Sequence, residues 1–239
     1  MASNEIIIPA SEFLNYLPKT YCNEFVNLCS IVPLPQGMRL HEAGQNFRKV
    51  YFPLTGYIVL QTSSTNDKPI DIALIGREGM VGATVLLGKN RAPYTAIVQE
   101  SGMALTISAS QFIIQAMQSK ALTKLTHLYI YLQMLQLGIS AACVCHHDVE
   151  SRLAKWLLMA NDRSRMSYLN LTHAALAKLL SVRRSAITVA AGNLKKGKLI
   201  RYKRGRVEIL SIANLENRSC SCYREERENY SICFSPGIK

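Results

Sequence analysis

Residues 171–200 carry the pattern that most restricts how this chain can fold. They read LTHAALAKLLSVRRSAITVAAGNLKKGKLI. Thr172 is a good helix N-cap, and an apolar face follows it, made of Leu176, Leu179 and Leu180. Ser181-Val182-Arg183 then interrupts the period. A second apolar stripe at helical spacing consists of Ile187, Ala190, Ala191 and Leu194. The segment therefore predicts two short helices joined by a tight turn, which is the form of a helix-turn-helix.

Residues 199–210 add a β-hairpin to this pair of helices. The sequence LIRYKRGRVEIL holds two β-type runs joined by a turn at Arg204-Gly205. A hairpin that carries four cations beside a helix-turn-helix is typical of a wing, whose tip touches the DNA backbone or the minor groove. The same two helices without DNA would be a plain αα-hairpin, which is the competing interpretation.

Helical geometry indicates which side chains of the second helix face outward. At about 100° per residue, placing Ile187 at the core turns Ser185 and Val189 away from it. Arg184 near the helix start can donate two hydrogen bonds to a guanine, whereas Lys195 and Lys196 suit phosphates better. The predicted DNA-contacting residues are Thr172, Arg183, Arg184, Ser185, Thr188, Val189, Lys195, Lys196, Arg201, Lys203, Arg204 and Arg206.

The charge of the chain is concentrated where this pattern lies. The net charge is +12, yet residues 1–150 hold 10 basic and 10 acidic residues, so the last 89 residues carry all of the excess. From Arg163 to Val207 there are 12 basic residues and no acidic one. Such a stretch indicates a surface for a polyanion, with nucleic acid favoured over an anionic membrane or a merely solubilising face.

The first half of the chain has a different sequence pattern, typical of β-strands. Between residues 33 and 108, short apolar runs alternate with glycine-containing turns at spacings near ten residues, which predicts an antiparallel sandwich or barrel. Helices are expected from about residue 111 and over about 120–145 and 149–161. The predicted fold class is α+β: an N-terminal β-roll resembling a jelly roll (1–118), a long dimerisation helix (119–147) and a C-terminal winged helix-turn-helix (148–239).

The long helix carries an apolar repeat at alternating spacings of three and four. The residues are Leu125, Leu128, Leu132, Leu135 and Ile139, followed by Ala142. This is the a/d seam of a coiled coil, so we predict that it pairs two subunits. The alternative is a helix that packs on the core of its own subunit.

Seven cysteines and five histidines raise the question of a metal. Cys143, Cys145, His146 and His147 gather four soft donors at a helix end, and Cys220-Ser221-Cys222 forms a second pair. The spacing matches no familiar site, because residues i and i+2 of a helix point apart. We therefore predict reduced structural cysteines and no metal or other cofactor, with metal or thiol sensing as the alternative.

Neither targeting nor catalysis is legible in the sequence. The N-terminus MASNEIIIPASEF lacks the pattern of a secretory signal, and no unbroken apolar run approaches the ~18 residues of a membrane helix. We thus expect a cytoplasmic protein without a membrane partner. No nucleophile elbow, metalloprotease or P-loop motif is present, so an enzyme is not expected.

With these residues placed, residues 33–230 resemble the Crp/Fnr family of bacterial transcription regulators. The likeness is strongest in the helix-turn-helix with VESRLAKWLLMANDR before it and IRYKRGRVEIL after it. It is weaker in VYFPLTGYIVL and IALIGREGMVG of the β-roll. The resemblance implies a homodimer on a palindromic operator, with RNA polymerase as a further partner and either activation or repression as the outcome. Arg184 falls on the base-reading arginine of the family.

The resemblance fails at the effector site. In members that bind cAMP, a Gly-Glu pair holds the ribose and an Arg-Ser/Thr-Ala sequence pairs with the cyclic phosphate. The matching residues here are Gly82, Ala83, Tyr94, Thr95 and Ala96, so both charged contacts are missing. We predict that the β-roll does not bind cAMP tightly and senses another effector or acts as a scaffold. The alternative for the whole chain is a ligand-binding or scaffold protein whose basic C-terminal region contacts nucleic acid or membrane without specificity.

Overall fold

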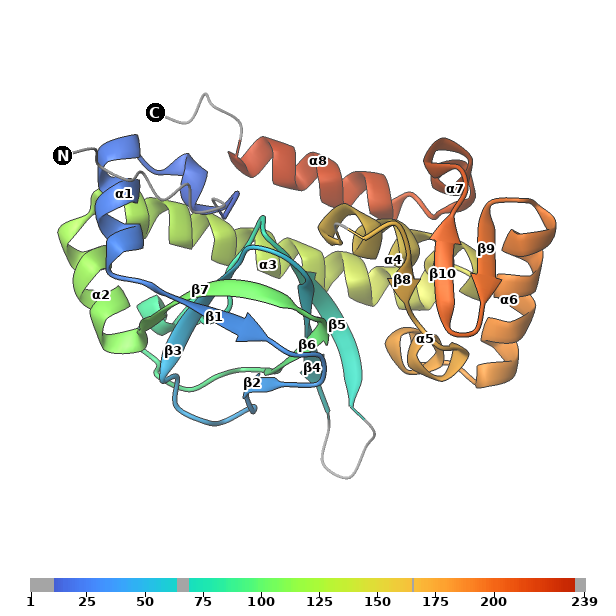
Figure 1. Ribbon diagram of the computed structural model, residues 1–239, viewed down its shortest axis with the longest axis horizontal. Coiled ribbons are helices and arrows are strands. Elements are labelled where there is room, and N and C mark those ends of the chain that lie inside the picture. The colour runs from blue at the N-terminus through green and yellow to red at the C-terminus, as the bar shows by residue number, and fades with distance from the viewer. Residues whose placement is uncertain (1–10, 64–68, 165, 235–239) are drawn as a thin grey trace, which may run out of the picture.

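The structure is a computed structural model that describes residues 11–63, 69–164 and 166–234. Figure 1 shows a β-roll at one end, a long helix that runs behind and above it, and a smaller mixed domain at the other end. The α+β class predicted from the sequence is confirmed. Residues 1–10, which belong to the predicted N-terminal domain (1–118), lie outside the described residues.

The β-roll consists of two antiparallel sheets that face each other. One has the order β1-β7-β3 and the other β2-β6-β4-β5. Their strands are β1 (Ser30–Leu34), β2 (Arg39–His41), β3 (Lys49–Pro53), β4 (Tyr57–Thr62), β5 (Ile70–Ile75), β6 (Thr95–Glu100) and β7 (Gly102–Ser108). The short 3-10 helix η2 (Ala83–Leu87) lies between β5 and β6. Because the apolar side chains of these strands point between the sheets, they form a buried core that holds the roll together.

An aromatic cluster closes the roll on the side of the helices. The rings of Phe13 and Phe52 stack with centroids 5.9 Å apart, and Phe25 packs edge-on against Phe52 at 5.7 Å. Phe13 precedes the 3-10 helix η1 (Leu14–Tyr16), and Phe25 lies in α1 (Lys19–Asn27). All three rings are fully buried, so the N-terminal helices belong to the same core as the sheets.

Two serine-capped helices leave the roll. Ser108 Oγ accepts a hydrogen bond from the Gln111 amide at the start of α2 (Ala109–Gln118), and Ser119 Oγ accepts one from Leu122 at the start of α3 (Lys120–His146). The helix α3 runs from the end of the molecule that carries α1 and α2 to the start of the C-terminal domain (Figure 1). By length and composition it is apolar enough to cross a membrane, and 33% of its most apolar window is buried within the subunit. Much of its apolar surface is therefore uncovered in a single chain.

The C-terminal domain is built from helices around a small sheet. Asp148 caps α4 (Val149–Arg163) by accepting hydrogen bonds from Glu150 and Ser151. The other elements are β8 (Leu169–Asn170), α5 (His173–Leu180), α6 (Arg184–Lys196), β9 (Ile200–Lys203), β10 (Arg206–Ile209) and α7 (Ile212–Arg218). The strands form an antiparallel sheet in the order β8-β10-β9. The two helices and the hairpin predicted from residues 171–210 are thus confirmed as a winged helix-turn-helix.

A last helix, α8 (Cys222–Phe234), was not predicted from the sequence. It runs back along α3 to the N-terminal end of the molecule (Figure 1). There the ring of Phe234 packs edge-on against Phe13 with centroids 6.4 Å apart, and Tyr230 Oη donates a hydrogen bond to the carbonyl oxygen of Glu78 at 3.0 Å. The C-terminal segment therefore contributes to the core of the N-terminal domain.

The predicted dimer seam is wrong for part of α3. Leu125, Leu132 and Ile139 are 7%, 1% and 8% exposed, because they pack inside their own subunit. Leu128 and Leu135 are only half-buried. Helix α3 is apolar on two sides, one packed against its own subunit and one open to solvent. The repeat chosen from the sequence combines residues of both sides. The open side holds Leu128, Tyr131, Leu135, Gly138, Ala142 and Cys145, again at spacings of three and four.

Candidate functional site

The helix-turn-helix is held by buried apolar residues and one arginine. The inner face of α6 is made of Ile187, Ala190, Ala191 and Leu194, all buried. Ser181 adopts a left-handed conformation (φ 52°) in the turn that separates α5 from α6. The buried Arg152 of α4 donates a hydrogen bond from Nη2 to the carbonyl oxygen of Leu180 at 2.7 Å. Because this bond satisfies the C-terminal end of α5, the turn is fixed against α4.

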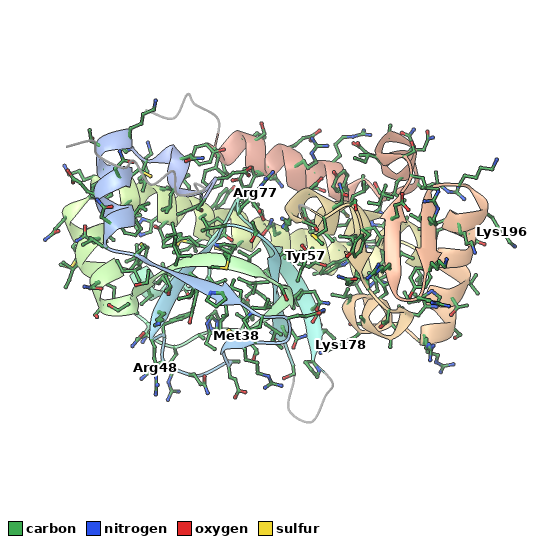
Figure 2. The ribbon with its side chains drawn as sticks, viewed as in Figure 1. Met38, Arg48, Tyr57, Arg77, Lys178 and Lys196 are labelled. Atoms are coloured by element: carbon green, nitrogen blue, oxygen red, sulfur yellow. The ribbon has the colours of Figure 1, made fainter. Side chains whose placement is uncertain are left out.

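All twelve residues predicted to contact DNA are exposed. They are Thr172, Arg183, Arg184, Ser185, Thr188, Val189, Lys195, Lys196, Arg201, Lys203, Arg204 and Arg206. Val189 is 64% exposed, which is unusual for an aliphatic residue in the middle of a helix and leaves its methyl groups free to touch a partner. Figure 2 shows Lys196 projecting from the end of the molecule farthest from the β-roll. The structure thus gathers these side chains at one end.

The start of α6 is suited to an anion. Its N-cap residue, Arg183, makes no side-chain cap hydrogen bond, so the first amides of the helix lack that partner. The positive end of the helix dipole and the side chains of Arg183 and Arg184 lie at the same place. The Thr188 hydroxyl donates a hydrogen bond to the carbonyl oxygen of Arg184 at 3.1 Å, so its methyl group is the part left for an outside contact.

Two of the four cations of the wing are exposed at its tip, and the other two contact neighbouring side chains. Its turn residues Arg204 and Gly205 both have positive φ, at 49° and 78°, which fits a tight two-residue hairpin. Arg201 pairs with Glu208 at 2.7 Å, and the guanidinium of Arg206 lies 4.6 Å from the ring centroid of Tyr168. Lys203 and Arg204 are exposed at the tip.

His173 links the wing to α6 and was missed from the sequence. Its ring lies against Tyr202 with centroids 4.5 Å apart, and its Nδ1 is 3.2 Å from Thr188 Oγ1. Burial, with the charge of Arg184 as a second cause, lowers the pKa of His173. No local sequence signal marks this contact, because it joins three elements that meet only in the folded domain. The exposed Lys198 was also left out of the predicted surface, although its place in the basic stretch could have included it.

The predicted effector site is small. Gly82, Ala83 and Tyr94 line a cavity of about 40 Å³ between the sheets and α3. Thr95 and Ala96 do not line it: Ala96 is fully buried, and Thr95 Oγ1 accepts a hydrogen bond from the Ala43 amide at 3.1 Å. Drug-sized ligands generally occupy pockets of roughly 300–1,000 Å³.

The charge of this cavity is also unlike that of a phosphate site. Among the described residues that line it there is no Arg or Lys. Burial lowers the pKa of the lining residue His41 to about 4, so this imidazole is neutral at physiological pH. The cavity as it stands therefore offers no cation to a cyclic phosphate.

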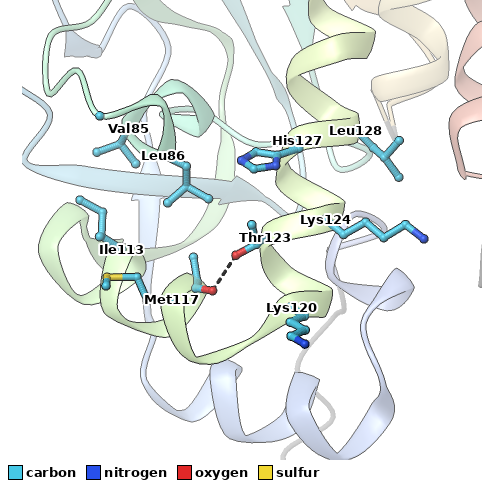
Figure 3. Close-up of a pocket in the computed structure, with 11 residues that line it drawn as sticks. Val85, Leu86, Ile113, Met117, Lys120, Thr123, Lys124, His127 and Leu128 are labelled. Carbon is cyan, nitrogen blue, oxygen red and sulfur yellow. Dashed lines mark hydrogen bonds between the residues drawn. The ribbon is translucent and has the colours of Figure 1, made fainter.

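A larger hollow lies nearby on the surface. It has a volume of about 930 Å³ and lies between η2, α2 and α3. Figure 3 shows its apolar side chains on η2 and α2, with Lys120, Thr123, Lys124 and His127 along α3. Thr123 Oγ1 donates a hydrogen bond to the carbonyl oxygen of Ala116 at 2.6 Å, which fixes the angle between α2 and α3. Sequence reasoning missed this groove, since its walls come from three separate elements.

The structure brings together two of the four metal candidates chosen from the sequence. Cys143 and His147 lie together and meet Cys220 and Cys222, with all four donor atoms within 4.8 Å of one another. Cys145 and His146 are exposed and do not belong to this group. The pairing across 77 residues is what the local spacing did not predict.

Comparison with known proteins agrees with this geometry. Residues 31–119 match the family model of a cyclic nucleotide-binding domain, and residues 151–218 match that of a Crp-like helix-turn-helix domain. No curated protein sequence matches the chain.

Solved structures extend the likeness to most of the chain. FixK2 from Bradyrhizobium japonicum is 11% identical with a TM-score of 0.68, covering 80% of this chain and 98% of that one. A putative Crp/Fnr-family regulator from Eubacterium rectale is 16% identical with a TM-score of 0.66, covering 85% and 95%. The c-di-GMP-responsive regulator CLP from Xanthomonas campestris is 14% identical with a TM-score of 0.63, covering 81% and 100%. At these identities the structures establish a shared fold.

Proposed function

We propose that this chain, which belongs to the Crp/Fnr family of transcription regulators, binds a specific two-fold symmetric DNA operator as a homodimer. The family consists of regulators and not enzymes. Helix α6 enters the major groove, and the wing contacts the adjoining backbone. RNA polymerase is the proposed further partner, and the cytoplasm is the proposed location. The observation that carries the proposal is the exposure of all twelve predicted contact residues at one end of the molecule.

The contacts divide into two kinds. Arg184, Ser185, Thr188 and Val189 lie on the first two turns of α6, where side chains reach base edges. Lys195, Lys196, Lys203 and Arg204 lie farther along the helix and at the tip of the wing, where they suit phosphates. Sequence preference then comes from the first set, while affinity and its dependence on salt come mostly from the second.

A homodimer is proposed because α3 has an open apolar side. Tyr131 and Met134 are 54% and 65% exposed, and Gly138, Ala141 and Ala142 next to them are small. Small residues allow two helices to approach closely, and the spacing of Leu128, Tyr131, Leu135, Gly138 and Ala142 is that of a coiled coil. Pairing along this side covers the apolar surface that the subunit leaves open. This assignment replaces the seam expected from Leu125, Leu132 and Ile139.

The proposal is tested by selecting bound fragments from sheared genomic DNA and measuring affinity for the selected site. We expect a palindromic consensus and a steep linear fall of log K with log salt concentration. Equal affinity for the selected duplex, a random duplex and heparin would instead identify a non-specific polyanion binder.

Arg184→Ala is predicted to weaken binding to the selected operator by about 1–3 kcal/mol, or about 5- to 150-fold. The loss arises because a bidentate pair with a guanine is removed. Fluorescence anisotropy with the operator and with duplexes altered at each position measures it. The variant should also discriminate less at one base pair of each half-site.

The matched control is Arg224→Ala, which removes the same charge from an exposed position on α8. It should leave both affinity and preference unchanged. Lys203→Ala should weaken all duplexes alike and reduce the salt slope by about 1. An Arg184→Ala protein with unaltered base preference would reject the assignment of Arg184.

The β-roll is predicted not to bind cAMP tightly. The missing phosphate-pairing arginine costs about 1.5–3 kcal/mol. The 40 Å³ cavity would also have to open before the nucleotide could enter. Isothermal titration calorimetry should detect no binding at micromolar concentrations, and a micromolar or tighter dissociation constant would contradict this prediction.

A further inference from the structure

The strongest unassigned feature is a group of soft donors at the hinge between α3 and α4. Cys143 lies in the last turn of α3, and His147, one turn later, is the C-cap residue of that helix. Cys220 and Cys222 come from the junction of α7 and α8. The Sγ atoms of Cys143 and Cys220 are 3.6 Å apart, and Cys222 Sγ is 3.5 Å from His147 Nδ1.

These separations fit the edges of a tetrahedral site. With Zn–S near 2.3 Å and Zn–N near 2.0 Å, two sulfurs lie about 3.8 Å apart and a sulfur and nitrogen about 3.5 Å apart. The two measured distances agree with both edges, and every pair of the four donors lies within 4.8 Å. The ligands of an iron–sulfur cluster are divided among several iron atoms and are farther apart, so a single ion fits better.

The surroundings match a closed structural site. Cys143, Cys220 and Cys222 are 4%, 6% and 4% exposed, and the buried side chain of Ile139 covers them from one turn earlier in α3. Four protein ligands leave no open position, which distinguishes a structural site from a catalytic one. Three thiolates and one neutral imidazole around Zn²⁺ carry a net charge of −1. Lys155 lies close enough to Cys143 and Cys222 to interact with that charge.

We propose that Cys143, His147, Cys220 and Cys222 bind one Zn²⁺ ion per subunit. The ion cross-links the end of α3 to the α7–α8 junction and so fixes the DNA-binding domain on the helix that carries it. Binding displaces the thiol protons to solvent, and the ion replaces them without any change of oxidation state. The Crp-like domain needs no such ion for its own core, since Ile187 and its neighbours are buried independently of the four donors.

The first test measures metal in the full-length reduced protein, purified without chelator and free of DNA. Inductively coupled plasma mass spectrometry should find one zinc ion per subunit. Replacing zinc with Co²⁺ should give a thiolate-to-cobalt charge-transfer band and the visible bands of a tetrahedral ion. Protein without zinc that also gives no thiolate band with Co²⁺ would overturn the proposal. A Cys143–Cys220 disulfide in protein alkylated at lysis would do the same.

Variants then assign the ligands. Cys222→Ser and Cys143→Ser should lose the stoichiometric ion. Cys145→Ser, a matched change two residues from Cys143 at an exposed position, should retain it. If the ligand variants do not fold, the cobalt spectrum of the unaltered chain still decides the matter. Equal loss of metal in Cys145→Ser and Cys222→Ser would reject the four-residue site. DNA plays no part in these measurements, so their failure would leave the proposed regulator function standing.

Discussion

Gly138→Arg is expected to convert the protein from a dimer to a monomer and to lower its affinity for the operator at least about 100-fold. One subunit reaches only one half-site, so half of the base and phosphate contacts are lost. A Cβ atom at Gly138 would meet nothing within 4 Å in the subunit, so a long side chain is accommodated there. In the paired state the same side chain would place a charge between two closely packed helices.

The substitution is informative because it should not harm the subunit itself. Arg has a higher helix propensity than Gly by roughly 0.8 kcal/mol, so α3 should become slightly more stable. Sedimentation velocity would report the change of mass, and urea denaturation would check that folding persists. Asn217→Arg, which adds the same charge at an exposed position of α7, serves as the control and should remain dimeric. A dimeric Gly138→Arg protein would place the subunit contact elsewhere.

Glu226→Ala should lower the free energy of unfolding by about 3–5 kcal/mol. Lys155 Nζ of α4 and Glu226 Oε1 of α8 are 2.5 Å apart, and their side chains are only 3% and 6% exposed. Removing the carboxylate leaves an ammonium ion in a site with little access to water. Among the residues that the structure describes, no other carboxylate forms an ion pair with Lys155, so a partner in contact no longer offsets the desolvation of its ammonium group.

The double variant Lys155→Met/Glu226→Leu separates this cause from a loss of packing. Replacing a buried ion pair by apolar side chains of similar volume is often neutral or stabilising. The double variant should therefore recover most of the stability lost in Glu226→Ala, as measured by urea denaturation at neutral pH. A double variant as unstable as Glu226→Ala would show that the unpaired charge of Lys155 is not the cause of the lost stability.

The winged helix-turn-helix was predictable because its signals are local. A cap at Thr172, two apolar stripes, a three-residue break and a turn at Arg204-Gly205 all lie within forty residues. These signals agree with one another in period and length, and the helices and strands of the structure lie at the positions that they predicted. Periodicity also gives the outward direction of Ser185 and Val189, because the inner face of a short amphipathic helix is unambiguous.

The dimer seam and the effector cavity show where this reasoning stops. Helix α3 is apolar on two sides, so a repeat such as Leu125-Leu128-Leu132 does not reveal which side the subunit covers. The grouping around Cys143 was not predictable for a similar reason, since Cys220 and Cys222 lie more than seventy residues farther along the chain and meet Cys143 and His147 only in the folded protein. The small volume next to Gly82 depends on how side chains from seven separate stretches of the chain fill the space, which no local pattern records.

The return of α8 to the N-terminal core adds an attachment for the DNA-binding head beyond its joint with α3 and its direct packing on the β-roll. The head is joined to α3 at His147-Asp148, and its last helix ends against Phe13 at the opposite end of the molecule. The head therefore cannot swing on a single pivot. A rotation of the head about the first joint would move α8 along α3 and break the contacts of Phe234 with Phe13 and of Tyr230 with Glu78. The alternative is a sharp bend of the chain between residues 218 and 222.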